Sequence, residues 1–180
     1  MPKPERYSTT HLSRIYFWTA TIHNWLPLLE DNANKEIIIQ SLRYLSSKGL
    51  ITVYAFVIMP NHIHLIWRLN ELNGKETAKG SFMKYTAHEL RKKLVESGQL
   101  QLFRVQAANK AHEIWQRDAM AIEIYYKKFA KQKLDYIHLN PIRGKWDLSR
   151  DHLSYYYSSI RFYEFGIDEF GFLNNILWEF

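Results

Sequence analysis

Two apolar stretches separated by a tight connection constrain the fold more than any other feature of this sequence. Residues 51–59 (ITVYAFVIM) form a nearly continuous apolar run, and residues 62–68 (HIHLIWR) form a second one. Met59, Pro60 and Asn61 connect them, and proline and asparagine favour tight turns. A continuous apolar run of this length is typical of a strand buried on both faces. The pattern therefore predicts a β-hairpin whose first strand lies at the centre of a sheet.

The segments around this hairpin complete a pattern of six elements. Residues 14–23 are rich in aromatic and β-branched side chains, which predicts a first strand. Helical spacing of apolar residues predicts helices over residues 33–47 and 76–97. Residues 98–113 are ambiguous between a loop and a short strand, and residues 114–124 are a candidate last strand. The order predicts an α+β, ferredoxin-like split βαβ fold, with helices on one face of an antiparallel sheet.

A further helix is expected after this unit. Residues 126–140 have a helical pattern, and Pro141 prevents a simple continuation of the helix. The length of the chain and the lack of a recognisable linker indicate one domain over residues 1–180. We expect its core at about residues 14–145 and a tail at about residues 146–180.

The distribution of charge favours a polyanionic partner. The net charge is +6, and the segment from Lys75 to Arg150 holds 16 basic and 8 acidic side chains. A solvated, lysine-rich helix face is the alternative explanation. If the partner is a nucleic acid, the candidate phosphate contacts are the basic side chains of Arg91, Lys92, Lys93, Arg117, Lys127, Lys128, Lys131 and Arg143.

Composition excludes several other classes of protein. The chain has no cysteine, which rules out disulfides and thiolate metal sites. The apolar runs are too short to span a bilayer, and the first residues lack the apolar segment of a secretory signal. We therefore expect a cytoplasmic protein without a membrane partner. Aromatic residues make up 16% of the chain, which favours exposed aromatic surface and leans toward a homodimer.

The second strand of the hairpin carries two candidate metal ligands. Side chains alternate along a strand, so His62 and His64 lie on one face, while Ile63, Leu65 and Trp67 lie on the other. Two imidazoles on one face can bind one divalent ion. The alternative is that both are hydrogen-bonded surface residues of an edge strand, because a His-X-His pattern alone has low specificity.

The last predicted helix carries a candidate nucleophile. Tyr136 and Asn140 are four residues apart and share one side of a helix. Asn140 also precedes Pro141, so it is a candidate C-terminal cap as well as a candidate oxygen ligand. Tyr136 is alternatively a packed aromatic residue, like most of the twelve tyrosines.

These motifs, taken in order, resemble those of a known family. The segment IMPNHIHLIW, followed by KLDYIHLNP at residues 133–141, is similar to the single-tyrosine HUH transposases of the insertion sequence 200/605 type, and closest to the REP-associated tyrosine transposases. Also similar are the segments WQR at 115–117, NPIRG at 140–144 and YSS at 157–159. The resemblance covers roughly residues 14–163.

The resemblance implies an activity and a set of roles. It implies that Mg²⁺ or Mn²⁺ is held by His62, His64 and Asn140, and that Tyr136 is the nucleophile. It further implies cleavage and rejoining of single-stranded DNA beside hairpins, through a 5′-phosphotyrosine and a free 3′-OH. Elementary chemistry is consistent with this, because a divalent ion neutralises charge on a scissile phosphate and a phenol needs activation.

Three alternatives remain open at this stage. The residues Asp118–Ala121 depart from the family pattern, which motivates a domesticated protein that binds hairpin DNA without cutting it. A replication initiator or relaxase would use the same chemistry but is usually longer. A structural zinc site at His62 and His64 would have few ligands without cysteine.

Overall fold

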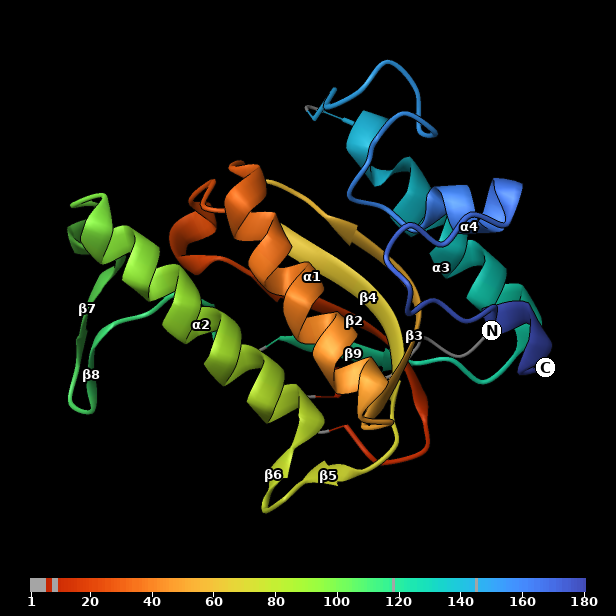
Figure 1. Ribbon diagram of the computed structural model, residues 1–180, viewed down its shortest axis with the longest axis horizontal. Coiled ribbons are helices and arrows are strands. Elements are labelled where there is room, and N and C mark those ends of the chain that lie inside the picture. Colours follow the sequence, from red (N-terminus) through yellow and green to blue (C-terminus); the bar gives the residue numbers. More distant parts are fainter. Residues whose placement is uncertain (1–5, 8–9, 118, 145) are drawn as a thin grey trace.

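An antiparallel sheet with helices on both faces forms the centre of the molecule. The computed structural model describes residues 6–7, 10–117, 119–144 and 146–180. The sheet has the strand order β1-β9-β2-β4-β3 (Figure 1). Its strands are β1 (Arg6–Tyr7), β2 (Ile15–Thr21), β3 (Ile51–Ile58), β4 (His62–Leu69) and β9 (Met120–Glu123). The α-helices are α1 (Asn32–Ser47), α2 (Ala78–Glu96), α3 (Lys127–Leu139) and α4 (Ile160–Phe165).

Short elements connect these strands and helices. They are two small hairpins, β5 (Leu72–Asn73) with β6 (Glu76–Thr77) and β7 (Arg104–Ala107) with β8 (Lys110–His112), and the 3-10 turns η1 (His23–Trp25), η2 (Leu100–Phe103), η3 (Asn140–Ile142) and η4 (Ile176–Trp178). No helix among the described residues has the length and apolar character needed to cross a membrane.

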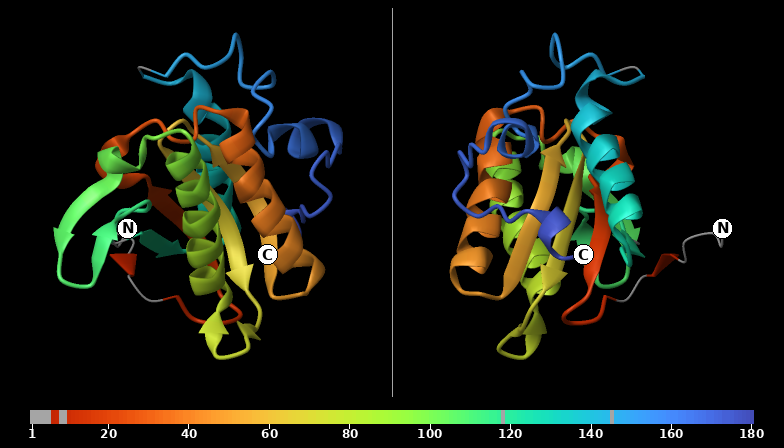
Figure 2. Two further views of the ribbon diagram at one scale, coloured as in Figure 1. Left: turned by 60° about the vertical axis from the view of Figure 1, so that its left-hand side comes forward. Right: turned by 90° about the vertical axis from the view of Figure 1, so that its right-hand side faces the viewer.

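The layers follow the predicted split βαβ order. Along the chain the elements β2, α1, β3, β4, α2 and β9 follow one another, and in space the strands lie as β9-β2-β4-β3 with every neighbouring pair antiparallel. Helices α1 and α2 cover one face of the sheet, and α3 lies against the opposite face (Figure 2). The α+β, ferredoxin-like prediction is therefore confirmed, with α3 as the additional helix.

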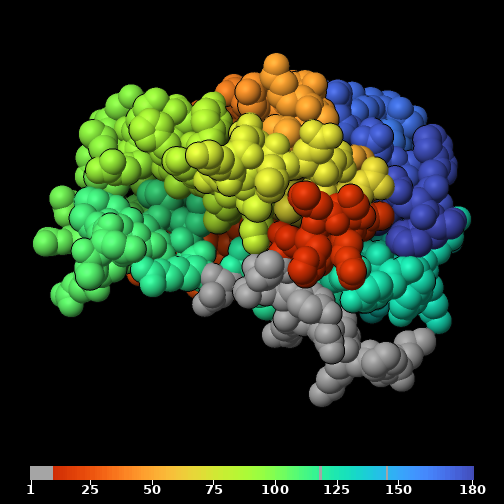
Figure 3. All heavy atoms as spheres, turned by 90° about the horizontal axis from the view of Figure 1, so that it is seen from below, coloured from red at the N-terminus to blue at the C-terminus, as the bar shows by residue number. Residues whose placement is uncertain are grey.

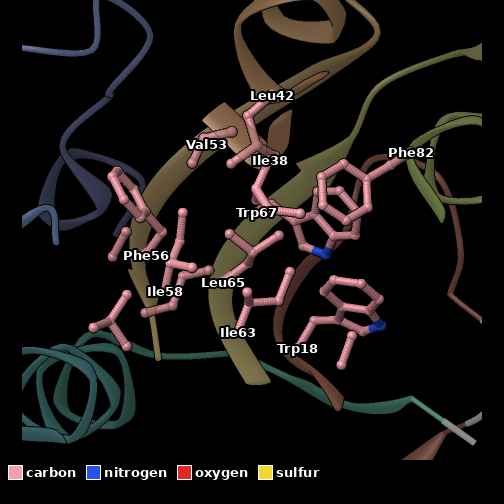
Figure 4. Close-up of a cluster of buried hydrophobic side chains, with 14 of the residues drawn as sticks. Trp18, Ile38, Leu42, Val53, Phe56, Ile58, Ile63, Leu65, Trp67 and Phe82 are labelled. Atoms are coloured by element: carbon pink, nitrogen blue, oxygen red, sulfur yellow. The ribbon is translucent and has the colours of Figure 1, made fainter. Parts of the chain in front are cut away.

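Strand alternation separates the core from the candidate site. On the face under α1 and α2, Ile63, Leu65 and Trp67 are fully buried, and the Trp67 ring packs against Trp18 and Phe82 (Figure 4). The centroids of the Trp18 and Trp67 rings are 4.9 Å apart. Burial of these large side chains holds β2 and β4 together, and it leaves the alternate residues of both strands pointing toward α3.

The predicted central position of residues 51–59 is wrong. Strand β3 lies at the end of the sheet, and β4 occupies the position between β3 and β2. The free edge of β3 is covered by the C-terminal tail instead of another strand, through bridges from Val53 to Leu173 and from Val57 to Ser158. The continuous apolar run therefore predicted the burial of this strand correctly, but it did not predict the position of the strand in the sheet.

The last strand is shorter than the predicted range of 114–124. Strand β9 begins at Met120, which pairs with Thr19, whereas Trp115 forms an isolated bridge with Ile22. From Thr19 to Ile22 the chain advances three residues, but from Trp115 to Met120 it advances five, so the segment between the two pairings cannot stay in register. Asp118, part of the segment that departs from the family pattern, lies outside the described residues.

Candidate functional site

Both histidines of the His-X-His motif are buried in the middle of the sheet. His62 is 6% exposed and His64 is 4% exposed, and β4 has partner strands on both sides. The alternative that they are surface residues of an edge strand is therefore wrong. Their ring centroids are 4.8 Å apart, as expected for neighbours on one face of a strand.

An amide fixes the protonation of the His62 ring. The Nδ2 of Asn61 donates to the backbone carbonyl of Trp25 at 3.1 Å, so the Oδ1 of Asn61 is the atom that faces His62. Since Oδ1 only accepts, the Nδ1 of His62 carries the proton in their 2.7 Å hydrogen bond. The lone pair of His62 is consequently on Nε2, which is the form that binds a metal.

A hydroxyl from the neighbouring strand holds the ring of His64. Thr19 is the cross-strand partner of His64, and its Oγ1 lies 2.7 Å from the Nδ1 of the ring. The other ring nitrogen, Nε2, is buried and has no hydrogen-bond partner. A buried polar atom without a partner is unfavourable unless something else satisfies it, so this nitrogen marks a place for a ligand.

Burial keeps the two imidazoles neutral. It lowers the pKa of His62 to about 4, and it lowers the pKa of His64 well below its ordinary value. Repulsion from a protonated His62 and from the positive charge of Lys133 lowers the pKa of His64 further. Neutral rings retain the lone pairs that metal binding requires.

Helix α3 presents a stripe of three polar residues beside its buried face. Lys133, Tyr136 and Asn140 are spaced three and four residues apart, so they share one side of the helix. The side that packs against the sheet contains Ala130, Leu134, Ile137 and His138. The stripe adjoins this buried side, which brings it next to the residues of β2 and β4 that face α3.

Tyr136 lies next to the histidine pair. The centroid of its ring is 5.2 Å from that of His64 and 5.7 Å from that of Phe17, both in edge-to-face contact. Tyr136 is nevertheless 41% exposed, so a substrate can reach it. The structure thus brings together His62, His64 and Tyr136 from elements far apart in the sequence.

Asn140 follows one turn later and is buried. It is 9% exposed, and its backbone keeps helical angles of φ −55° and ψ −43° although the chain tightens there into the turn η3. Its backbone N–H bonds to the carbonyl of Ile137, while its side-chain amide makes no hydrogen bond within the described part of the chain. The alternative that this side chain caps the helix therefore gains no support from a hydrogen bond.

Lys133 is a site residue that the sequence did not single out. Its Nζ lies 4.6 Å from the centroid of the Phe17 ring and 5.7 Å from that of Tyr136. Burial lowers the pKa of this ammonium group. A half-buried cation beside Tyr136 is placed to attract an anion such as a phosphate.

The tail holds α3 in place against the sheet. The Nε2 of His138 and the Oγ of Ser159 share a hydrogen bond of 2.9 Å, and the same Oγ accepts from the backbone N–H of Phe56 in β3 at 3.0 Å. The segment at 157–159, which resembles a family motif, therefore links α3 to the edge of the sheet. The 115–117 segment has a comparable structural role, because the Nε1 of Trp115 donates to the Oγ1 of Thr86 on α2.

The candidate DNA-binding residues divide between two regions of the molecule. Lys127, Lys128 and Lys131 are exposed on α3, and Arg143 is exposed just after it. Arg91, Lys92 and Lys93 are exposed on α2, across the sheet from the histidines, and Arg117 pairs with Glu113. Seen from below, α3 and the tail lie on one side of the molecule and the β7–β8 hairpin on the other (Figure 3). The residues on and just after α3 therefore lie nearest in the chain to Tyr136, whereas those on α2 lie across the sheet from it.

The residues around His62 and His64 fit a metal with few protein ligands. No third histidine, aspartate or glutamate joins them in the described ranges, and Asn140 remains a candidate ligand because the family resemblance implies it. Two imidazole nitrogens suit a transition-metal ion better than Mg²⁺, which prefers oxygen ligands.

Comparison with known proteins gave matches among solved structures but none among curated protein sequences or family models. Among solved structures, a REP-associated tyrosine transposase bound to a REP hairpin is similar over 98% of this chain and 93% of that chain, with a TM-score of 0.59 and 18% sequence identity. This likeness shows that the two chains share a fold.

Proposed function

We propose that this chain is a metal-dependent DNA transposase-type enzyme that cuts and rejoins single-stranded DNA beside hairpins, with Tyr136 as its nucleophile. The observation that carries the proposal is the 5.2 Å contact between the rings of Tyr136 and His64, beside a buried imidazole nitrogen that has no partner. A packed core tyrosine would not need an adjacent pair of neutral, oriented histidines. The similar transposase structure, which holds a DNA hairpin, supports the choice of DNA.

His62, His64 and Asn140 would hold Mn²⁺ or Mg²⁺. When bound, the ion supplies positive charge against the scissile phosphate and lowers the cost of forming a phenolate. Asn61 and Thr19 hydrogen-bond the Nδ1 atoms of His62 and His64. These bonds would fix the orientation of each ring and leave its Nε2 for the metal. Lys133 would add a second positive charge on the same side of α3.

The proposed step needs no external energy source, because one phosphodiester bond is exchanged for another. The phenol oxygen of Tyr136 attacks the phosphorus, and the bond from phosphorus to the 3′ oxygen breaks. The phenol gives its proton to solvent, and the departing 3′ oxygen takes one up. The products are a 5′-phosphotyrosine and a free 3′-OH, and attack by another 3′-OH reverses the step and joins strands.

The test is a search for the covalent adduct. The wild-type protein with Mn²⁺ is incubated with hairpin oligonucleotides whose single-stranded flanks are randomised, and adducts are separated on a denaturing gel. We expect an adduct whose modified peptide contains Tyr136, and we expect Tyr136→Phe to abolish it while salt-sensitive binding remains. Tyr126→Phe is the matched control, because Tyr126 is also exposed beside α3 but contacts Phe129 instead of a histidine.

Two outcomes would redirect the proposal. An adduct that persists in Tyr136→Phe would show that another residue is the nucleophile. Hairpin binding by the wild-type protein without adduct, across Mn²⁺ and Mg²⁺, would favour a DNA-binding protein that has lost cleavage.

A further inference from the structure

Two tryptophans flank His62, which is one of the proposed metal ligands. The ring centroid of Trp25 lies 6.0 Å from that of His62, and the ring centroid of Trp146 lies 5.7 Å from it. Trp25 belongs to the turn η1 after β2, whereas Trp146 belongs to the segment after α3. The two indoles therefore approach one imidazole from separate parts of the chain.

Trp25 is exposed, unlike the tryptophans of the core. It is 57% exposed, whereas Trp18 and Trp67 are fully buried and Trp115 is 6% exposed. Exposure of a large apolar ring beside a polar site is unfavourable in water, so Trp25 does not contribute to the core. An aromatic face that is open to solvent is available to a ligand.

The backbone at Trp25 is also strained. Its φ is +56°, and the φ of the preceding Asn24 is +52°. Left-handed backbone is uncommon for a bulky residue and costs about 1 to 3 kcal/mol where it occurs. Asparagine tolerates this conformation because its short polar side chain can form local hydrogen bonds, whereas the side chain of tryptophan has no such compensation.

The same amide that orients His62 holds this strained turn. The carbonyl of Trp25 accepts from the Nδ2 of Asn61, and the Oδ1 of Asn61 accepts from the Nδ1 of His62. The backbone N–H of Trp25 bonds in addition to the carbonyl of Ile22 at 2.9 Å. The position of the exposed indole is consequently tied to the position of the histidine ring.

We propose that Trp25 and Trp146 form a stacking subsite for the nucleobase next to the phosphate that Tyr136 attacks. This inference rests on the proposed function. Indole rings stack on any base, which suits a single strand whose bases are unpaired. The positive charge of Lys133 and of the exposed lysines on α3 favours a nucleic acid over an uncharged apolar partner.

The test measures binding, so it does not depend on cleavage. In a Tyr136→Phe background, hairpin oligonucleotides receive one abasic site at successive positions of the single-stranded flank, and affinity is measured by anisotropy. Trp25→Asn removes the indole and suits the left-handed backbone, so the variant is expected to fold at least as well as the parent. We expect it to bind the intact oligonucleotide roughly 5- to 150-fold more weakly, which is the range of one base stack.

The decisive result is coupling between the indole and one base. At one flank position, the abasic site and Trp25→Asn should each weaken binding, and together they should weaken it no more than either alone. Trp178→Asn is the matched control, because Trp178 is 85% exposed and makes no described contact with His62; it should show no such coupling. Quenching of tryptophan fluorescence by the oligonucleotide should also fall in Trp25→Asn.

Failure of this inference differs from failure of the proposed function. If the wild type forms the Tyr136 adduct but Trp25→Asn binds every oligonucleotide as the parent does, the subsite is overturned and the enzyme stands. If coupling is found and no adduct forms, Trp25 still stacks on a base of bound DNA, and only the cleavage proposal falls. If Trp25→Asn instead weakened the binding of an added apolar peptide and showed no coupling to any base, Trp25 would contact a protein partner. That result would overturn the subsite.

Discussion

Replacing Thr19 with valine removes the hydroxyl that orients His64 and changes little else in the shape of the side chain. The 2.7 Å hydrogen bond to the Nδ1 of His64 is lost, and the buried ring is left with two unpaired nitrogens. An unsatisfied buried polar group costs about 1 to 3 kcal/mol. We therefore expect the metal-free variant to lose about that much free energy of unfolding.

The larger effect is expected on metal binding. Loss of a hydrogen bond to a ligating imidazole typically weakens metal affinity about 10- to 100-fold. At a Mn²⁺ concentration about 100 times the wild-type dissociation constant, binding stabilises the wild type by about 2.7 kcal/mol. The same concentration should stabilise Thr19→Val by only about 0.4 to 1.4 kcal/mol.

The assay is urea unfolding with and without Mn²⁺, combined with titration calorimetry. Thr21→Val is the matched control, because Thr21 lies on the same strand opposite His62, faces the same side and makes no described side-chain hydrogen bond to a histidine. The control should keep the Mn²⁺ stabilisation of the wild type. If Thr19→Val bound Mn²⁺ as tightly as the wild type, the hydrogen bond would not be what prepares His64 for a metal.

Three other measurements examine different parts of the structure. The free energy of unfolding should fall between pH 6.5 and pH 4.5, because burial lowers the pKa of His62 to about 4 and that of His138 to about 3, so the unfolded chain takes up protons that the folded chain does not. Each group contributes about 2 to 3 kcal/mol at pH 4.5, and His138→Gln should show a shallower fall in pH-dependent urea unfolding. Leu65→Ala should lower stability by about 2 to 5 kcal/mol in the same assay, because Leu65 is fully buried, and a loss below 1 kcal/mol would contradict its core role. Lys131→Gln should reduce the salt dependence of single-stranded DNA binding by about 0.7 in slope, whereas Lys92→Gln, across the sheet and paired with Glu89, should leave it unchanged.

The hairpin and the helices were predictable because each depends on local spacing. Alternation along β4 sends Ile63 and Leu65 toward the core and leaves His62 and His64 on the other face, and this is what the structure has. The position of β3 was not predictable in the same way. Its burial comes from the tail more than 100 residues later, and an apolar run contains no information about which segment covers it.

In the candidate site too, the features set by local spacing were predictable, and those set by contacts between distant segments were not. Helical spacing was enough to place Tyr136 and Asn140 on one side of α3. Thr19 could not have been identified, because its contact with His64 depends on the register between β2 and β4. Lys133 resembles its neighbouring lysines in sequence, and only the packing of α3 shows which of them lies over Phe17.

The separation of α3 from the sheet unit has a consequence for how the protein is made. Both histidines and Thr19 lie on β2 and β4, which leave the ribosome well before the helix that carries Tyr136. Ser159, which bonds His138 and so anchors that helix, emerges later still. Translation therefore delivers Tyr136, the proposed nucleophile, and its anchor after the strands that carry the proposed histidine ligands. A nascent chain that stalls within β9 would lack the proposed nucleophile, however much of the sheet it had formed.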